Sequence, residues 1–147
     1  MSQSDFEQSP NYRKGVQLVG EMLGPQFQAG MLAAAGSGAF AADCAAIALE
    51  SAFGAVWSRP GLARRDRSLV TLGILIGTGK PNELKNHVRA GLNNGLTVQE
   101  LQEVLIQAIP YAGFPAVAEA IEATVAVLRE RGLVDEQTRT AKDRGML

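Results

Sequence analysis

The chain has 147 residues, of which 46% are hydrophobic and 20% charged, and its formal net charge is −1 at pH 7. The length suits one domain with a core of its own, and the charge balance argues against a nucleic-acid partner and against a disordered chain. We therefore predict a single domain over residues 1–147, with flexible ends at residues 1–10 and 135–147.

Membrane and disulfide signals are missing from the sequence. The longest run with few charges, residues 30–42, contains Gly36 and Gly38 and falls short of the roughly 20 apolar residues of a membrane span. No secretion signal opens the chain, which predicts a cytoplasmic protein that binds no membrane.

Cys44 is the single cysteine, so an internal disulfide and a Cys-x-x-Cys pair are excluded. Its alanine-rich surroundings predict a buried, unreactive thiol.

Three helices are predicted in the first 60 residues. Glycine or proline ends helices at about residues 11–23 and 27–35. A third helix, residues 41–56, is apolar nearly all round. Its only charged residues, Asp43 and Glu50, are seven positions apart and therefore share a face. This pattern predicts that Glu50 lies in apolar surroundings.

A central helix is predicted over residues 68–77. The β-branched residues of this run would also suit a buried strand, but no second strand-like run follows to pair with it. Arg64, Arg65 and Arg67 precede it, and positive charge is unfavourable at a helix amino terminus. We expect a carboxylate near these arginines, either from the protein or from a substrate.

The only histidine of the chain, His87, belongs to a helix predicted to begin near Pro81 and to end at residues 93–95. Leu84 and Val88 mark its apolar stripe, with His87 at the edge and Glu83 one turn earlier on the same side. An imidazole with a carboxylate in reach suits acid or base chemistry near neutral pH. The position alone also fits a purely structural histidine.

Two further helices complete an all-α pattern. Thr97 and Glu100 form a capping-box signature before a helix that Pro110 should kink or end. A bend at Gly113 precedes a last helix over residues 117–128, closed by a glycine. The sequence therefore predicts a compact helical bundle.

Several separated motifs, in one order and spacing, resemble the carboxymuconolactone decarboxylase family. The resemblance covers about residues 48–118, through the segments 53–62, 67–72, 83–90, 93–95 and 111–115. It implies an all-α subunit of the alkylhydroperoxidase D-like type that assembles as a homotrimer or homohexamer. The implied reaction is loss of CO2 from 4-carboxymuconolactone in aromatic-compound catabolism, without metal or organic cofactor. Such a carboxy-lyase acts on a small-molecule carboxylate or lactone, because the substrate's own lactone carbonyl accepts the electrons.

The resemblance also implies roles for individual residues. It makes His87 the proton-transferring residue, with Glu83 or Glu50 to orient it or to pass the proton on. Arg59 and Arg67 are implied to hold substrate carboxylates, which guanidinium groups bind in two-point geometry. Trp57 and Tyr111 are implied to line the pocket. A structural reading stays open for three of these: Glu50 as an intersubunit salt-bridge partner, and Trp57 and Tyr111 as packing residues.

Departures from the family pattern leave two other functions open. An arginine pair ends the first helix of the true decarboxylases, whereas Val19 and Gly20 stand here, which predicts a different or less anionic substrate. The chain could be a non-catalytic oligomeric scaffold that binds a small molecule or partner. The other function is that of a peroxidase branch of the superfamily, which uses Cys-x-x-Cys. Lys80 and Glu83 occupy those positions here, so the thiols that this activity needs are missing.

Overall fold

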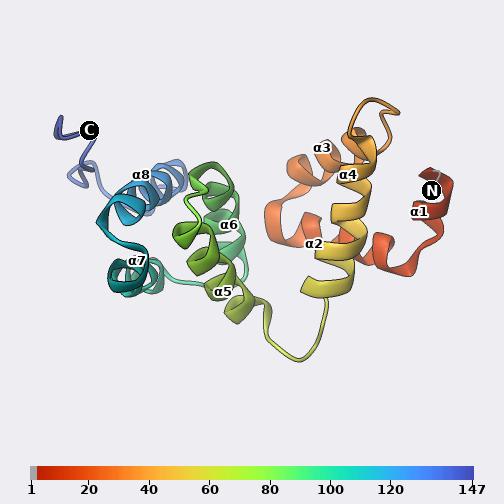
Figure 1. Cartoon of the computed structure of the whole chain (residues 1–147), viewed down its shortest axis with the longest axis horizontal. Coiled ribbons are helices and arrows are strands. Elements are labelled where there is room, and N and C mark those ends of the chain that lie inside the picture. Colours follow the sequence, from red (N-terminus) through yellow and green to blue (C-terminus); the bar gives the residue numbers. More distant parts are fainter. Residues whose placement is uncertain (1–2) are drawn as a thin grey trace. The chain divides into compact units, whose positions relative to one another are not determined.

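The computed structural model describes residues 3–147, and the regular structure that it contains is helical, as predicted (Figure 1). The chain divides into two compact units, unit 1 ending at Arg64 and unit 2 running from Arg65 to Leu147. Among residues 3–147, no helix is both long and apolar enough to cross a membrane. The prediction that the whole chain forms a single domain stays a prediction, and the units are described in turn.

Unit 1 contains the helices α1 (Gln3–Gln8), α2 (Pro10–Leu23), α3 (Pro25–Ala35) and α4 (Ala42–Ile47), followed by the π-helix η1 (Ala48–Trp57). Helix α1 was not predicted from the sequence. Its Phe6 is 3% exposed and lies 6.2 Å from Tyr12, measured between ring centroids. Residues 1 and 2 of the predicted flexible start lie outside the described residues.

Two glycines let α2 and η1 approach each other closely. A Cβ atom on Gly15 would overlap the backbone of Leu49, and one on Gly54 would overlap the carbonyl group of Asn11. The predicted helix 41–56 exists as α4 and η1 in succession, but its second part is a π-helix. Because π-helical hydrogen bonds run from residue i to i+5, η1 is wider than the α-helix that the periodicity predicted.

Unit 2 contains α5 (Arg64–Gly77, which begins at the last residue of unit 1), α6 (Pro81–Asn93), α7 (Val98–Ala112) and α8 (Phe114–Glu130). The run at 68–77 is helical, as predicted, although the helix begins four residues earlier. Large side chains interlock between these helices and are almost fully buried. They include Leu72, Ile76, Leu84, Val88, Leu101, Val117, Val127 and Leu128.

The sequence predicted the start of α7 correctly but placed its end too early. The capping box is confirmed, since Glu100 N–H donates to Thr97 Oγ1 at 3.1 Å and Thr97 N–H donates to Glu100 Oε2 at 2.9 Å. The helix continues two residues beyond Pro110, so this proline does not end it, and the predicted alternative of a kink stays a prediction. Pro110 lies in the last turn, where its missing N–H removes a single hydrogen bond, and the helix ends at Gly113 with φ 86°.

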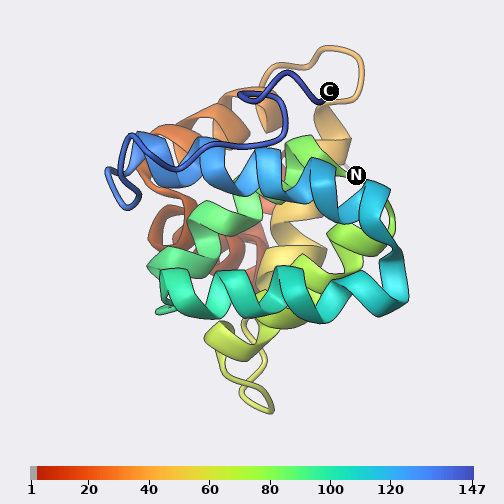
Figure 2. The ribbon, with the colours of Figure 1, turned by 90° about the vertical axis from the view of Figure 1, so that its left-hand side faces the viewer.

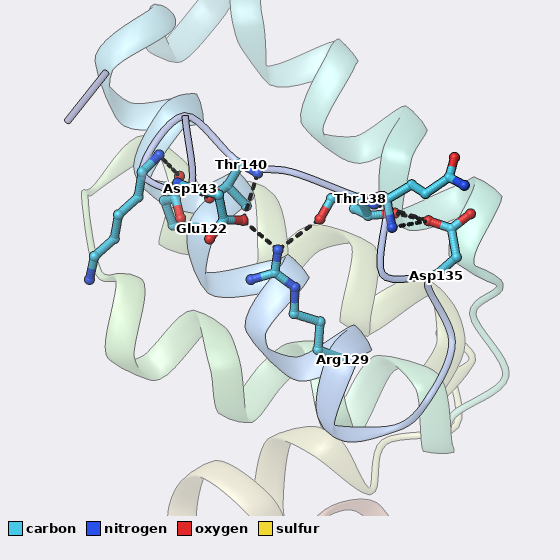
Figure 3. A network of polar contacts seen from close by, with 8 residues as sticks. Glu122, Arg129, Asp135, Thr138, Thr140 and Asp143 are labelled. Carbon is cyan, nitrogen blue, oxygen red and sulfur yellow. Dashed lines mark hydrogen bonds and ion pairs between the residues drawn. The ribbon is translucent and has the colours of Figure 1, made fainter. Parts of the chain in front are cut away.

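The carboxyl-terminal segment lies along α8 (Figure 2). Figure 3 shows Arg129 on α8 between the carbonyl oxygen of Thr138, at 2.7 Å, and the carboxylate of Asp143. The neighbouring Arg129 holds the pKa of Asp143 well below its usual range. The backbone N–H of Lys142 donates to Glu122, and Thr140 is 3% exposed. Flexibility of residues 135–147 stays a prediction, and these contacts oppose it.

Candidate functional site

Helix α6 places His87 at the boundary between the core of unit 2 and its surface. Pro81 occupies the first turn of α6, where its missing N–H costs nothing. Leu84 and Val88 are 2% and 1% exposed and anchor the helix in the core, whereas His87 retains 8% exposure. Its Nδ1 atom is buried. The histidine therefore has an apolar environment and a narrow route to solvent.

Glu83 is the carboxylate that lies beside His87. Its Oε1 is 3.6 Å from His87 Nε2, one helical turn away, which is too long for a good hydrogen bond but within ion-pair range. Burial lowers the pKa of His87, and the nearby Glu83 opposes this effect only in part. The imidazole is therefore mainly neutral at pH 7. The predicted proximity of Glu83 and His87 is confirmed.

Trp57 and Arg59 lie together in unit 1. Trp57 is the last residue of η1 and Arg59 comes two positions later. Both line a cleft of about 330 Å³ between this end of η1 and α2, and Trp57 is 9% exposed. We call this the basic cleft, because its lining contains three cationic side chains and one carboxylate. Its full lining is Lys14, Gln17, Leu18, Glu21, Trp57, Ser58, Arg59 and Arg64.

Tyr111 lines a larger groove in unit 2, between α5 and α7, with a volume of about 580 Å³. We call it the α5–α7 groove. Leu69, Gly73, Val104 and Ala108 supply its apolar floor, and Tyr111 stands at 83% exposure. The lining does not include Arg67, which is half-buried on α5. The two residues therefore do not meet in this groove.

The two remaining predictions in unit 1 have different outcomes. Glu50 is half-buried on η1, as its apolar neighbourhood led us to expect. Cys44 is exposed, so the prediction of a buried thiol is wrong. The surrounding alanines misled the prediction because Ala46 is the one buried residue of α4, Ala42 and Ala45 are half-buried, and Cys44 lies on the exposed face.

The arginines before the central helix have protein carboxylates as partners. Arg64 Nη1 lies 2.6 Å from Glu21 Oε2, and Arg65 pairs with both Asp66 and Glu100. The expectation of a nearby carboxylate is confirmed for these two arginines. The pair between Arg65 and Glu100 also joins α5 to the capped start of α7, which holds two elements of unit 2 together.

Sequence reasoning missed several polar side chains. Lys14 and Glu21 join the basic cleft from α2, far in the chain from Trp57, so no local pattern marked them. Ser68 is fully buried and accepts a hydrogen bond from Asn94 Nδ2 at 3.1 Å. The local sequence offers one signal for the contact between Ser68 and Asn94: the Ser68 hydroxyl lies one helical turn before the buried Leu72.

Fold and geometry together define a class: an all-α protein that holds a neutral, buried imidazole beside a carboxylate. Residues 42–126, more than half of the chain, match the carboxymuconolactone decarboxylase family, and the chain belongs to this family.

Two curated relatives have named activities. The chain is 44% identical over 86 residues to the 4-carboxymuconolactone decarboxylase of Acinetobacter baylyi, covering 58% of this chain and 64% of that protein. It is 47% identical over 75 residues to the nitrosuccinic acid decarboxylase npaB of Metarhizium robertsii, covering 51% and 52%. The matched part of the chain thus spans between half and two thirds of the length of these relatives.

A third relative has no named activity. An uncharacterized 15.0 kDa protein of Paracoccus denitrificans, from an nqo9-nqo10 intergenic region, is 34% identical over 84 residues. The match covers 56% of this chain and 63% of that protein.

Proposed function

We propose that this chain is a decarboxylase acting on a small, electronically activated carboxylic acid or lactone, with His87 as the proton-transferring residue. Family membership and the likeness to two named decarboxylases support the reaction class. The observation that supports the role of His87 is its burial on α6, with Nε2 3.6 Å from Glu83 Oε1.

The chemistry of the proposed reaction needs an electron acceptor within the substrate. When the bond between carbon and the carboxylate breaks, CO2 leaves and the bonding electron pair stays on the substrate. In 4-carboxymuconolactone the ring double bond passes this pair to the lactone carbonyl, and in nitrosuccinic acid the nitro group can take it. The protein then has to orient the substrate, stabilise the developing negative charge and deliver one proton.

His87 would deliver that proton as an imidazolium. Because burial disfavours the charged ring, a proton on His87 is held weakly and is readily given to the carbanionic carbon. Glu83 is about half exposed, which suits it to pass a new proton from solvent to the ring. The carboxylate would also stabilise the short-lived imidazolium.

The proposal also assigns roles to residues outside α6. Arg59 and Trp57 are assigned to substrate binding because both line the basic cleft. Arg67, Tyr111 and Glu50 keep the roles that the family resemblance implies, as a carboxylate contact, a pocket wall and an alternative proton relay.

The proposal is tested with purified protein and 4-carboxymuconolactone or nitrosuccinic acid, by following CO2 release and the ultraviolet change. We expect turnover of at least one acid, and a loss of about 100-fold or more in kcat for His87→Ala. Lys85→Gln on the same helix is the matched control and should keep its rate. A His87→Ala variant that assembles normally and turns over at the wild-type rate would remove His87 from the mechanism.

A non-catalytic binding or scaffold protein is the second candidate. The basic cleft and the α5–α7 groove offer such a protein places to bind a small molecule. A scaffold would bind the same acids without releasing CO2, and His87→Ala would leave binding unchanged. The turnover assay above therefore separates the two candidates.

We also propose that the chain assembles as a homotrimer or homohexamer. Large exposed apolar side chains on α5 and α8 support self-association, with Val70, Ile74 and Phe114 exposed at 56%, 58% and 73%. Light scattering after size-exclusion chromatography measures the mass directly. A monomer at micromolar concentration would contradict this part of the proposal.

A further inference from the structure

Unit 2 contains a second apolar cavity, which lies between α7 and α8 and has a volume of about 350 Å³. We call it the α7–α8 pocket. Its inner wall belongs to the core, because Leu101, Val117 and Leu128 are buried there. Ile106 and Ile121 also line it and are 48% and 37% exposed. Apolar surface is therefore left in contact with water at a site that reaches the core, and a ligand that covered it would gain free energy.

The polar groups in the lining of the α7–α8 pocket are few and uncharged. Gln102 on α7 and Thr124 on α8 supply an amide and a hydroxyl group, and Thr138 supplies a second hydroxyl group. Within residues 3–147, every side chain that lines the pocket is uncharged. An ionised ligand would lose its hydration there without gaining a partner of opposite charge, which is costly. The lining therefore selects a neutral molecule with few polar groups.

The carboxyl-terminal segment supplies one side of the α7–α8 pocket through Val134 and Thr138. The carboxylate of Asp135 accepts hydrogen bonds from the backbone N–H of Thr138 at 2.9 Å and from its hydroxyl group at 3.1 Å. Arg129 on α8 donates to the carbonyl oxygen of Thr138 and pairs with Asp143 (Figure 3). These contacts hold this wall in place before a ligand arrives, and a preformed site loses less entropy on binding.

We propose that the α7–α8 pocket binds a small neutral organic molecule about the size of a substituted benzene, with Arg129 as the residue that positions one wall. An apolar cavity of about 150 Å³ already holds benzene, so a volume of about 350 Å³ leaves room for a ring with a polar substituent. The substituent would meet the hydroxyl group of Thr124 or the amide of Gln102. The inference goes beyond the proposed function, because this ligand has no carboxylate to lose.

Benzamide is the probe, and a ligand-observed NMR titration with the full chain measures its binding. It is a neutral ring with one amide group. Benzamidine is the matched ligand, because it has nearly the same shape but is a cation at pH 7. We expect saturable binding of benzamide and a Kd for benzamidine at least about tenfold higher. Equal affinity for the two compounds would show that the site does not select neutral molecules and would overturn the inference.

A substitution at the mouth of the α7–α8 pocket tests its location. Ile121→Trp should fill the space with a larger side chain and raise the Kd for benzamide about tenfold or more. Ile74→Trp makes the same change at an exposed position on α5, whereas the pocket is built from α7, α8 and the carboxyl-terminal segment. Its Kd should stay within twofold of the wild-type value. Benzamide binding that is absent, or unchanged in a folded Ile121→Trp variant, overturns the inference.

The positioning role of Arg129 has its own test. Arg129→Gln removes the contacts with Thr138 and Asp143 and should raise the Kd for benzamide about threefold or more. Arg131→Gln is the matched control, because Arg131 donates to Asn93 on α6 at 3.2 Å. Equal affinity in these two variants would remove Arg129 from the proposal. Circular dichroism verifies folding, and Asp143→Asn, with the same change in Kd expected, replaces Arg129→Gln if that variant unfolds.

A second copy of the chain is the competing occupant of the α7–α8 pocket. If benzamide does not bind and Ile121→Trp lowers the mass measured by light scattering, a second copy covers the pocket and the inference is overturned. Decarboxylation is measured separately with the acids named above. Benzamide binding that responds to Ile121→Trp in a chain that releases no CO2 would uphold the inference while the proposed function fails.

Discussion

Units 1 and 2 both bury large apolar side chains, but unit 1 adds a helix contact of a second kind. In unit 1, Gly15 and Gly54 allow the backbones of α2 and η1 to touch, so the contact depends on missing side chains. In unit 2, large residues such as Leu84 and Val88 fill the space between helices. Unit 1 should therefore be damaged by added atoms, whereas unit 2 should be damaged by removed ones.

The largest expected effect on stability is in the core of unit 2. Leu84→Ala removes three carbon atoms from a site that is 2% exposed, and it should lower the free energy of unfolding by about 3 kcal/mol. Leu133→Ala, at a site 46% exposed, is the matched control and should cost far less. Urea denaturation followed by circular dichroism measures both. Equal costs would show that burial does not distinguish the sites.

The same denaturation tests whether the chain is one domain. Trp57 belongs to unit 1, so its fluorescence follows that unit, while circular dichroism follows the helices of both. For a single domain, Leu84→Ala in unit 2 should shift both curves together. A Trp57 curve that does not move would separate the units and contradict the single-domain prediction.

The second effect tests the close contact in unit 1. Gly54→Ala places a methyl group against the Asn11 carbonyl, and we expect a loss of about 2 kcal/mol. Gly30→Ala is the matched control, because no atom lies within 4 Å of its added Cβ and α3 gains helix propensity. Thermal unfolding should give Gly54→Ala a lower melting temperature than the wild type and Gly30→Ala a higher one. A neutral Gly54→Ala would mean that η1 can move away without cost.

A smaller effect compares helix caps in the two units. Thr97→Ala removes the capping box of α7 and should cost about 1 kcal/mol. Ser9→Ala removes the cap of α2, whose hydrogen bond from Tyr12 N–H to Ser9 Oγ is long at 3.4 Å, so its cost should be lower. Urea midpoints for both variants provide the comparison, and a larger cost at Ser9 would contradict it.

The smallest effect concerns pH and is confined to His87. Because burial lowers the pKa of His87 in the folded protein, the folded state resists protonation more than the unfolded state does. Its contribution to stability is complete above the unfolded pKa of about 6.5 and is lost as the pH falls through the lower, folded pKa. Turnover should move in the opposite direction and rise over that range, because the imidazolium is the proposed donor. His87→Gln should flatten both profiles between pH 7 and 5.

Local signals in the sequence were sufficient where neighbouring residues determine the structure. Thr97 and Glu100 satisfy each other's backbone groups, so the start of α7 was predictable from four residues. The relation between Glu83 and His87 follows from helical spacing alone.

Features that depend on distant residues could not be predicted in this way. The π-helix η1 adjoins α2, a contact between positions about 40 residues apart. Lys14, Arg59 and Arg64 acquire their common cleft only when these elements pack. The alanine-rich surroundings also gave the wrong burial for Cys44, because small apolar side chains are found on protein surfaces as well as in cores.

The exposed thiol of Cys44 has a practical consequence for work on the purified protein. A single accessible thiol on each chain allows two chains to become covalently joined when a preparation oxidises in air. Such a product would resemble a natural dimer by mass and would complicate any measurement of assembly. A reducing agent, or the substitution Cys44→Ser, removes this product, and the same thiol accepts one maleimide dye per chain for fluorescence labelling.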